Sequence, residues 1–465
     1  MKKENDLGRD KISSLVFRIA LPSMLAQFVS VLYSIVDRIY IGNIPGTGDI
    51  ALAGVGVCGP VVTMVGSAAF LIGIGGSPLM SIRLGEKNVK AAEKILANSF
   101  LSLCVISVIL MAVVMPLATP MLRVFGASSV TLPYSTEYFL TYMMGTPFAL
   151  LSVGMNQFVI CQGYAKKGMK SVMLGAVSNI ILDPIFIFLF DMGVKGAAIA
   201  TVISQIASCI YVLSFLFGKK VPVKITFSGY SFKIIRKILV LGFSPFAIIA
   251  LDNVMIIAMN SVLQHYGGPE QGDMLVTCAT IVQSLMLVVT MPLGGITGGT
   301  QTILGYNYGA RDTSRVKKAQ RYIFLLCVAF TGIMFVLSWT CGIYFVRLFT
   351  SDAKLLEETM KAVRICTLAI IPLGIQYEIV DGFTAMGQVK FSLPLSFWRK
   401  GIYFAAIFLL PMFFGAKAVF YAEPLSDIIG PAVSVIIYLI FMKRILKKRE
   451  STSLIETEPP ALQRV

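Results

Sequence analysis

Polar side chains inside long apolar segments are the residues of this chain that could do chemistry. Ionisable groups among them are few in the first half of the 465-residue sequence: Asp37, Arg38 next to it and Asp183, with the amide of Asn179 one helical turn before Asp183. An ionisable group at the centre of a bilayer costs roughly 2.5 kcal/mol or more, so it rarely persists without a task. At 1.5 Å per residue from the outer helix ends, Asp37 lies about 6 Å deep and Asp183 and Thr201 about 11 Å.

Together these four residues predict a site for a small cation or a proton. Two carboxylates, an amide and a hydroxyl offer hard oxygen ligands to Na⁺, or a pair of acids of which one can hold a proton. The alternative is that Asp37 pairs with Arg38 and that the others only pack helices. Neighbouring helix positions do not face each other, however, and Arg38 is near enough to the surface to extend to it.

Two prolines flank this set, Pro22 in the first apolar segment and Pro184 directly after Asp183. A proline inside a helix removes a backbone hydrogen bond, so we expect helix bending at both positions. Ordinary prolines of membrane helices, with no role in motion, are the alternative.

A second group of ionisable residues lies in apolar segments of the second half of the chain: Asp252, Glu378, Asp381, Arg399, Glu423 and Asp427. Arg399 and Glu378 fall at a similar depth, which predicts a structural ion pair of Arg399 with Glu378 or Asp381. A second location for the coupling site is the alternative. Asn260 stands where Asp37 would repeat, so the first-half site is not duplicated.

The composition explains where these residues must sit. Hydrophobic residues make up 56% and charged residues 14%, with a mean hydropathy of +0.80, whereas soluble proteins carry roughly 25% charged residues. A soluble, disordered, collagenous or disulfide-stapled chain is excluded, and an all-α integral membrane protein remains.

Twelve segments are long enough to cross a bilayer core of about 30 Å as helices. They are Leu15–Ile41, Ile50–Ile82, Ala92–Val124, Tyr134–Gln162, Ser171–Phe190, Val194–Leu216, Ile235–Leu263, Met274–Leu304, Tyr322–Phe349, Leu355–Met386, Val389–Phe413 and Ala416–Met442.

The net charge of +16 follows from topology and needs no nucleic-acid partner. The 40 Lys and Arg crowd into the N-terminus, alternate loops and the tail, including Lys219 and Lys220 after the sixth segment. By the positive-inside rule, both termini are expected in the cytoplasm of a multi-pass protein of the cell membrane.

The two halves resemble each other, which predicts a duplication. Pro22 and Asp37 match Pro245 and Asn260 at one offset, and Gly163 matches Gly387 at nearly the same offset. Six spans return the chain to its starting side, so the repeats are parallel and their axis lies along the membrane normal. We expect an N-terminal six-helix lobe at 1–218, a cytoplasmic linker at 219–236, a C-terminal six-helix lobe at 237–448 and a polar tail at 449–465.

No Walker A sequence occurs, and the single histidine, His265, falls in a loop, so the sequence predicts neither an ATPase nor an enzyme and no cofactor. The stretches Ile19-Ala-Leu-Pro22, Tyr33-Ser-Ile-Val-Asp37-Arg-Ile-Tyr-Ile-Gly42, Asn179-x-x-x-Asp183-Pro184 and Gly193-x-x-Gly-Ala-Ala-Ile-Ala-Thr201 resemble the multidrug and toxic compound extrusion (MATE) transporters. The resemblance spans essentially the whole chain.

The resemblance implies an antiporter that exports amphipathic, often cationic drugs and dyes in exchange for H⁺ or Na⁺. It carries the cation site onto Asp37, Asn179, Asp183 and Thr201, while other branches place coupling carboxylates in the second half. We expect a monomer whose partners are these small molecules and membrane lipid. A flippase for lipid-linked precursors and, more weakly, an intramembrane enzyme or a non-transporting receptor are the alternatives.

Overall fold

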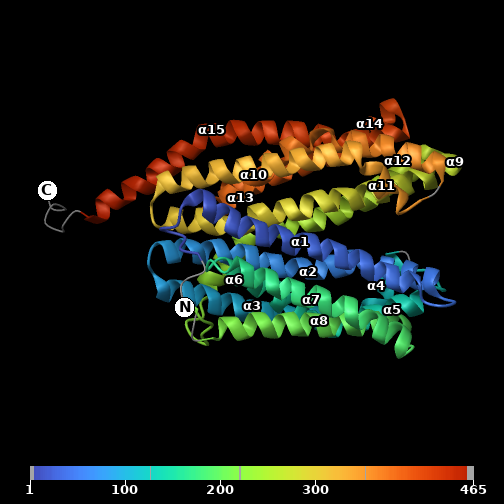
Figure 1. Ribbon diagram of the computed structural model, residues 1–465, viewed down its shortest axis with the longest axis horizontal. Helices are drawn as coiled ribbons and strands as arrows, with labels where there is room; N and C mark the ends of the chain where they lie inside the picture. Colours follow the sequence, from blue (N-terminus) through green and yellow to red (C-terminus); the bar gives the residue numbers. More distant parts are fainter. Residues whose placement is uncertain (1–4, 126, 219–220, 351, 458–465) are drawn as a thin grey trace. The chain divides into compact units, whose positions relative to one another are not determined.

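The computed structural model describes residues 5–125, 127–218, 221–350 and 352–457, and all regular structure within these ranges is helical (Figure 1). Parts of the predicted linker and tail, with Lys219 and Lys220, therefore lie outside the described residues. The helices are α1 (Ile12–Gly42), α2 (Gly48–Gly85), α3 (Val89–Val114), α4 (Ala118–Val124), α5 (Leu132–Met144), α6 (Thr146–Ile160), α7 (Ala165–Pro184), η1 (Ile185–Leu189), α8 (Gly193–Leu216), α9 (Phe232–Gly309), α10 (Thr313–Thr340), α11 (Gly342–Arg347), α12 (Ala353–Cys366), η2 (Thr367–Ala369), α13 (Ile370–Ala385), α14 (Val389–Phe414), η3 (Ala416–Tyr421) and α15 (Ala422–Thr457).

Eleven helical spans in the described residues are long and apolar enough to cross a membrane, and twelve if the bent pair α5 and α6 counts as one. The label α9 covers two of these spans, Phe232–Gly268 and Met274–Gly309. They separate at Gly268, whose φ of 63° lies in the left-handed region that favours glycine. The all-α, multi-span membrane architecture predicted from the sequence is confirmed.

Four predicted spans differ clearly in extent from the structure, and one of them is the last, which continues to Ser451 instead of ending at Met442. The third ends at Val114 instead of Val124, because Pro116 cannot continue the hydrogen-bond ladder, and the short helix α4 follows. The fourth is broken into α5 and α6, which meet at 55°. The ninth begins earlier, at Thr313, where the side chain of Asp312 accepts a hydrogen bond from the backbone of the first turn. It also ends earlier, at Thr340, and α11 follows.

The chain forms two compact units. The first comprises the described residues of Met1–Asn5, Leu21–Met80 and Asn88–Ala250, and the second those of Asp6–Ala20, Ser81–Lys87 and Leu251–Val465. These units reflect packing and not sequence repeats, so the predicted lobes at 1–218 and 237–448 stay a prediction.

Within the first unit, α2 and α9 approach each other at glycines. A Cβ atom at Gly242 would lie 1.7 Å from the carbonyl oxygen of Leu71, and one at Gly75 would lie 2.3 Å from that of Ile238. Small residues let membrane helices bring their backbones together where larger side chains would hold them apart. Side chains therefore cannot be added at either position without moving a backbone.

The described part of the linker is held against the first unit by side-chain amides. Gln162 Oε1 accepts from the backbone N–H of Val223 at 2.9 Å. Asn98 donates to the carbonyl oxygen of Gly229 at 3.1 Å and accepts from the N–H of Ser231 at 2.9 Å. The segment 223–231 is thus a strap fastened at both ends.

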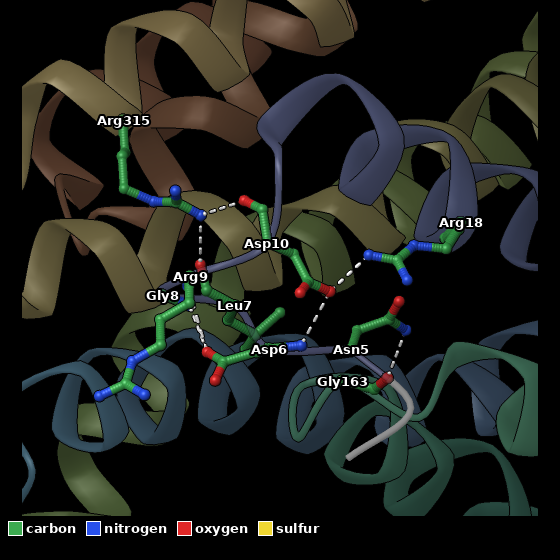
Figure 2. A network of polar contacts seen from close by, with 9 residues as sticks. All are labelled: Asn5, Asp6, Leu7, Gly8, Arg9, Asp10, Arg18, Gly163 and Arg315. Atoms are coloured by element: carbon green, nitrogen blue, oxygen red, sulfur yellow. Dashed lines mark hydrogen bonds and ion pairs between the residues drawn. The ribbon is translucent and has the colours of Figure 1, made fainter. Parts of the chain in front are cut away.

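The first described residues make separate contacts in each unit (Figure 2). In the first unit, Asn5 donates to the carbonyl oxygen of Gly163 at 2.8 Å. In the second, Arg315 on α10 donates to the carbonyl oxygens of Leu7 and Asp10 at 3.1 and 2.9 Å. The N-terminal segment before α1 is therefore bonded to the fold at both of its ends.

A charged cluster closes the helix ends of the second unit. Glu86 pairs with Arg83 at 2.6 Å and with Arg449, which also donates to the carbonyl oxygens of Tyr308 and Gly309. Burial opposes the charged form of Glu86, but hydrogen bonds from Arg449 and Arg83 outweigh it and hold the pKa of the carboxyl below its usual range.

Candidate functional site

The four predicted residues of the first half come together inside the first unit. Asp37 lies on α1, Asn179 and Asp183 lie on α7, and Thr201 lies on α8, which runs beside α7 (Figure 1). Asn179 Nδ2 donates to Asp183 Oδ1 at 3.0 Å and to Thr201 Oγ1 at 3.3 Å. Asp183 is fully buried and Asn179 is 2% exposed.

The two carboxyl groups of this set face each other. The side chains of Asp37 and Asp183 lie within hydrogen-bonding reach, and two carboxyl groups share a hydrogen bond only when one of them holds a proton. Arg38, the alternative partner of Asp37, is exposed.

Three buried oxygen atoms of the set have no hydrogen-bond donor among the described residues. They are Oδ1 of Asp37, Oδ1 of Asn179 and Oδ2 of Asp183. A buried polar atom without a partner costs roughly 1–3 kcal/mol, and more when it is charged. The arrangement is therefore one that a proton or a small cation would stabilise.

The backbone changes form directly beside Asp183. Helix α7 ends at Pro184, and Ile185–Leu189 follow as a π-helical turn. Wide turns of this kind are often found at functional sites, and the proline withholds one donor from the ladder. Helix α1 continues unbroken through Pro22, so bending at that proline stays a prediction.

Sequence reasoning missed a group of tyrosines around Asp37. Tyr33 lies one turn before Asp37, and both Tyr33 and Tyr138 interact electrostatically with its carboxyl group. The rings of Tyr138 and Tyr142 stack with centroids 6.2 Å apart. The four-residue spacing from Tyr33 to Asp37 could have revealed the first tyrosine. Tyr138 and Tyr142 could not be found in this way, because no local sequence signal shows that α5 packs near α1.

The ionisable residues of the second half are arranged differently from the prediction. Arg399 on α14 pairs with Asp427 on α15 at 2.8 Å, and not with Glu378 or Asp381. The predicted pair was wrong because equal depth does not make two helices face each other, whereas α14 and α15 pack together. Glu378 is 3% exposed, and its Oε1 has no hydrogen-bond donor among the described residues.

The other three members of that group are Asp381, Asp252 and Glu423. Asp381 on α13 lies near the side chains of Thr297 and Gln301, and Asp252 forms an ion pair with Lys400. Glu423 lies in the first turn of α15, one turn before Asp427. Arg399 and Lys400 on α14 thus each pair with a different acid, Asp427 and Asp252.

Comparison with known proteins identifies the family. The MatE family model matches residues 22–185 and 246–406, which together make up most of the chain. The chain belongs to the MATE family. Members of this family are multidrug transporters and not enzymes.

Curated relatives and solved structures agree with this assignment. The multidrug export protein MepA of Staphylococcus aureus (strain MSSA476) is 22% identical over 435 residues, which are 93% of this chain and 95% of that protein. MepA of Staphylococcus saprophyticus is 22% identical over 439 residues, 94% of this chain and 95% of that protein.

Two structures show the same fold at low sequence identity. A MOP superfamily transporter from Pyrococcus furiosus, described as having a binding pocket of reverse polarity, superimposes with a TM-score of 0.88 at 23% identity and covers 96% of this chain and 99% of its own. An outward-facing multidrug resistance MATE transporter gives 0.88 at 22% identity with the same coverage.

Proposed function

We propose that this protein is an antiporter of the cell membrane that exports amphipathic, often cationic compounds in exchange for H⁺, with Asp37 and Asp183 as the coupling pair. The observation that carries the proposal is the close approach of these two carboxyl groups, each of which has one buried oxygen without a donor among the described residues. The curated relatives named above are multidrug export proteins, which supports the substrate class.

A proton is favoured over Na⁺ by the same contact. A shared hydrogen bond between carboxyl groups holds one proton, whereas Na⁺ would need the oxygens of Asn179 and Thr201 turned toward it as well. In the structure, Thr201 Oγ1 donates to the carbonyl oxygen of Ala197 at 3.0 Å and accepts from Asn179. Na⁺ at Asp37, Asn179, Asp183 and Thr201 remains the alternative that the experiment separates.

Coupling follows from the charge of the pair. With one proton, the pair carries a single negative charge and its oxygens are satisfied, and without it two buried carboxylates repel each other. We propose that the drug is held only by the form that has lost the proton, because exchange without mutual exclusion would dissipate the gradient. One proton supplies about 1.4 kcal/mol per tenfold concentration ratio and about 2.3 kcal/mol per 100 mV.

The test is export of a cationic dye from proteoliposomes under an imposed gradient of pH or of Na⁺, with the membrane potential clamped. Asp37→Asn and Asp183→Asn keep the shape of each side chain but cannot take up and release a proton. We expect each variant to lose gradient-driven export and, because it keeps the single negative charge of the protonated pair at every pH, to lose the pH dependence of dye binding. Asp191→Asn removes an exposed acid from the loop before α8 and is the matched control, with export unchanged.

Near-normal coupled export in both variants would refute the assignment, and loss in Glu378→Gln alone would move the coupling group to α13. Export driven by a Na⁺ gradient at constant pH would keep Asp37 and Asp183 as the coupling site but identify Na⁺, and not H⁺, as the coupling ion. Loss of folding is distinguished by the elution profile and thermal denaturation of the purified variants.

A further inference from the structure

The strap between α8 and α9 turns aliphatic side chains inward and aromatic and basic side chains outward. Val223 and Ile225 are 0% and 5% exposed, whereas Phe227 and Tyr230 are 69% and 46% exposed. Lys224, between the two buried residues, is exposed as well. The strap therefore has one face packed on the first unit and one open face, and none of its residues belongs to the coupling pair proposed above.

The ends of two helices hold the open face in place. The ring of Phe227 stacks on that of Phe217, the residue that caps α8, with centroids 5.8 Å apart. Both rings meet Phe100 of α3 edge-on, at 6.2 and 6.0 Å. The backbone N–H of Ile225 donates to the carbonyl oxygen of Leu216 at 3.1 Å. The exposed rings are thus carried by a backbone tied to the end of a membrane span.

The open face continues the surface that both flanking spans present to lipid. On α9, Phe232, Val240 and Phe243 are 77%, 51% and 48% exposed, and spacings of eight and three residues place them on one helix face. On α8, the exposed Ile210 and Phe217 lie seven residues apart, which is about two turns. Exposed aromatic side chains at the ends of membrane spans are typical of the headgroup level. The strap therefore lies where the hydrocarbon core meets the headgroups.

This surface carries positive charge that neighbouring acids do not neutralise. The sequence has no Asp or Glu between Asp191 and Asp252. The start of α3, which packs against the strap, contributes Lys90, Glu93 and Lys94 and so adds positive charge on balance. The exposed basic side chains of the strap and of the first turns of α9, none of which forms an ion pair with a described residue, are Lys224, Lys233, Arg236 and Lys237.

We propose that the open face of the strap and the first turns of α9 bind anionic phospholipid headgroups of the membrane leaflet at this end of the first unit. The aromatic rings lie at the boundary between headgroups and acyl chains, and the ammonium and guanidinium groups contact the phosphates. A basic segment next to a membrane span favours anionic lipid by about fivefold for each Lys or Arg at the surface. A soluble acidic partner would match only the charge, whereas the lipid matches both the charge and the rings.

The experiment measures how strongly brominated phospholipids quench one fluorescent side chain of the full-length protein. The probe is Phe232→Trp in a background of Trp339→Phe and Trp398→Phe, which replaces the two native tryptophans. In vesicles that mix phosphatidylglycerol with phosphatidylcholine, quenching by each brominated lipid in turn gives the lipid composition around the probe. We expect phosphatidylglycerol to be enriched there by about fivefold or more over the bulk membrane. Tyr230→Trp is a second probe should Phe232→Trp elute as an aggregate.

Charge variants separate headgroup binding from simple burial of the rings in lipid. Lys224→Gln with Lys233→Gln, added to the probe background, should bring the composition around the probe close to that of the bulk membrane. Lys443→Gln with Lys447→Gln removes the same charge from exposed positions of α15 and is the matched control. This control should leave the enrichment unchanged. Elution profiles and thermal denaturation verify that each variant is folded.

Two results would overturn the proposal. One is enrichment of phosphatidylglycerol in the strap variant as high as in its control, or none in the probe protein itself. The other is a probe that neither brominated lipid quenches, because the open face would then lie in water and be free for a soluble acidic partner. Ser451→Trp, an exposed position about 13 Å beyond Met442 along α15, is the reference that should not be quenched.

Discussion

Removing one partner of the buried ion pair between Arg399 and Asp427 should destabilise the second unit more than removing both charges. Arg399 is 9% exposed and Asp427 is fully buried, with 2.8 Å between Nη1 and Oδ1. A Cβ atom at Gly430 would lie 2.8 Å from Arg399 Cγ, so the aliphatic part of Arg399 packs against that glycine. Arg399→Met keeps this packing and removes only the charge.

The expected magnitude follows from what the substitution leaves behind. In Arg399→Met the carboxylate of Asp427 is buried without its cation, and breaking a buried pair from one side costs about 3–5 kcal/mol. The unfolding entropy is about 2.1 cal/mol/K per residue, or roughly 1 kcal/mol/K for this chain, so the melting temperature should fall by about 3–5 °C. Arg399→Met combined with Asp427→Asn should recover most of that loss.

The assay is thermal denaturation of the purified variants in detergent, together with dye export from proteoliposomes. Lys400→Met is the matched control, because its partner Asp252 has a side chain that is 42% exposed, whereas Asp427 is fully buried. We expect this control to lose less than Arg399→Met. A double variant no more stable than Arg399→Met would refute the reasoning, and equal stability with lost export would make the pair functional.

Three further predictions follow from contacts described above. Because the folded-state pKa of Glu86 is lowered, its ion pairs contribute to stability fully at neutral pH and lose that contribution as the pH falls through the lowered pKa. The melting temperatures of wild type and Glu86→Gln should therefore converge in acid, and a constant difference would contradict the role of Arg449. Gly242→Ala should prevent folding, measured by size-exclusion elution, whereas Gly59→Ala, with open space around it, should not. Asn98→Ala releases one end of the linker strap and should speed proteolysis there; an unchanged cleavage rate would show that its hydrogen bonds do not hold the strap.

The spans were predictable because hydrophobic length is a local property. Most predicted boundaries lie close to those of the structure. At the last span the helix continues through the charged tail to Ser451, and at two other exceptions a local signal competes with hydropathy. Pro116 ends α3 inside an apolar run, and the cap at Asp312 starts α10 in a polar one. A hydropathy average detects neither effect, although the proline and the capping aspartate can both be recognised in the sequence.

The estimated depth of a residue in the membrane predicted side-chain contacts in the first half of the chain but not in the second. Asn179 and Asp183 share one helix face, and α7 and α8 are neighbours along the chain, so local geometry sufficed to bring Thr201 to them. Arg399 had several acids at similar depth, and its partner was decided by which helices pack side by side. Rotation of a helix about its axis, which determines such partners, depends on contacts distant in sequence.

The boundary between the two compact units runs through the interior of helices. Helix α1 passes from the second unit to the first after Ala20, α2 passes back after Met80, and α9 passes after Ala250. A continuous helix is stiff, since each residue is tied to the one four positions away. Each of these boundaries therefore falls within a segment of backbone that resists bending along most of its length.

Each of these three helices lacks a backbone hydrogen bond close to the unit boundary that it crosses. Pro22, Pro78 and Pro245 lie within a few residues of the three boundaries, and each lacks the N–H that would bond to the preceding turn. The backbone is most compliant in bending where a helix has lost such a bond. Each of the three helices is thus locally more compliant in bending near the boundary that it crosses.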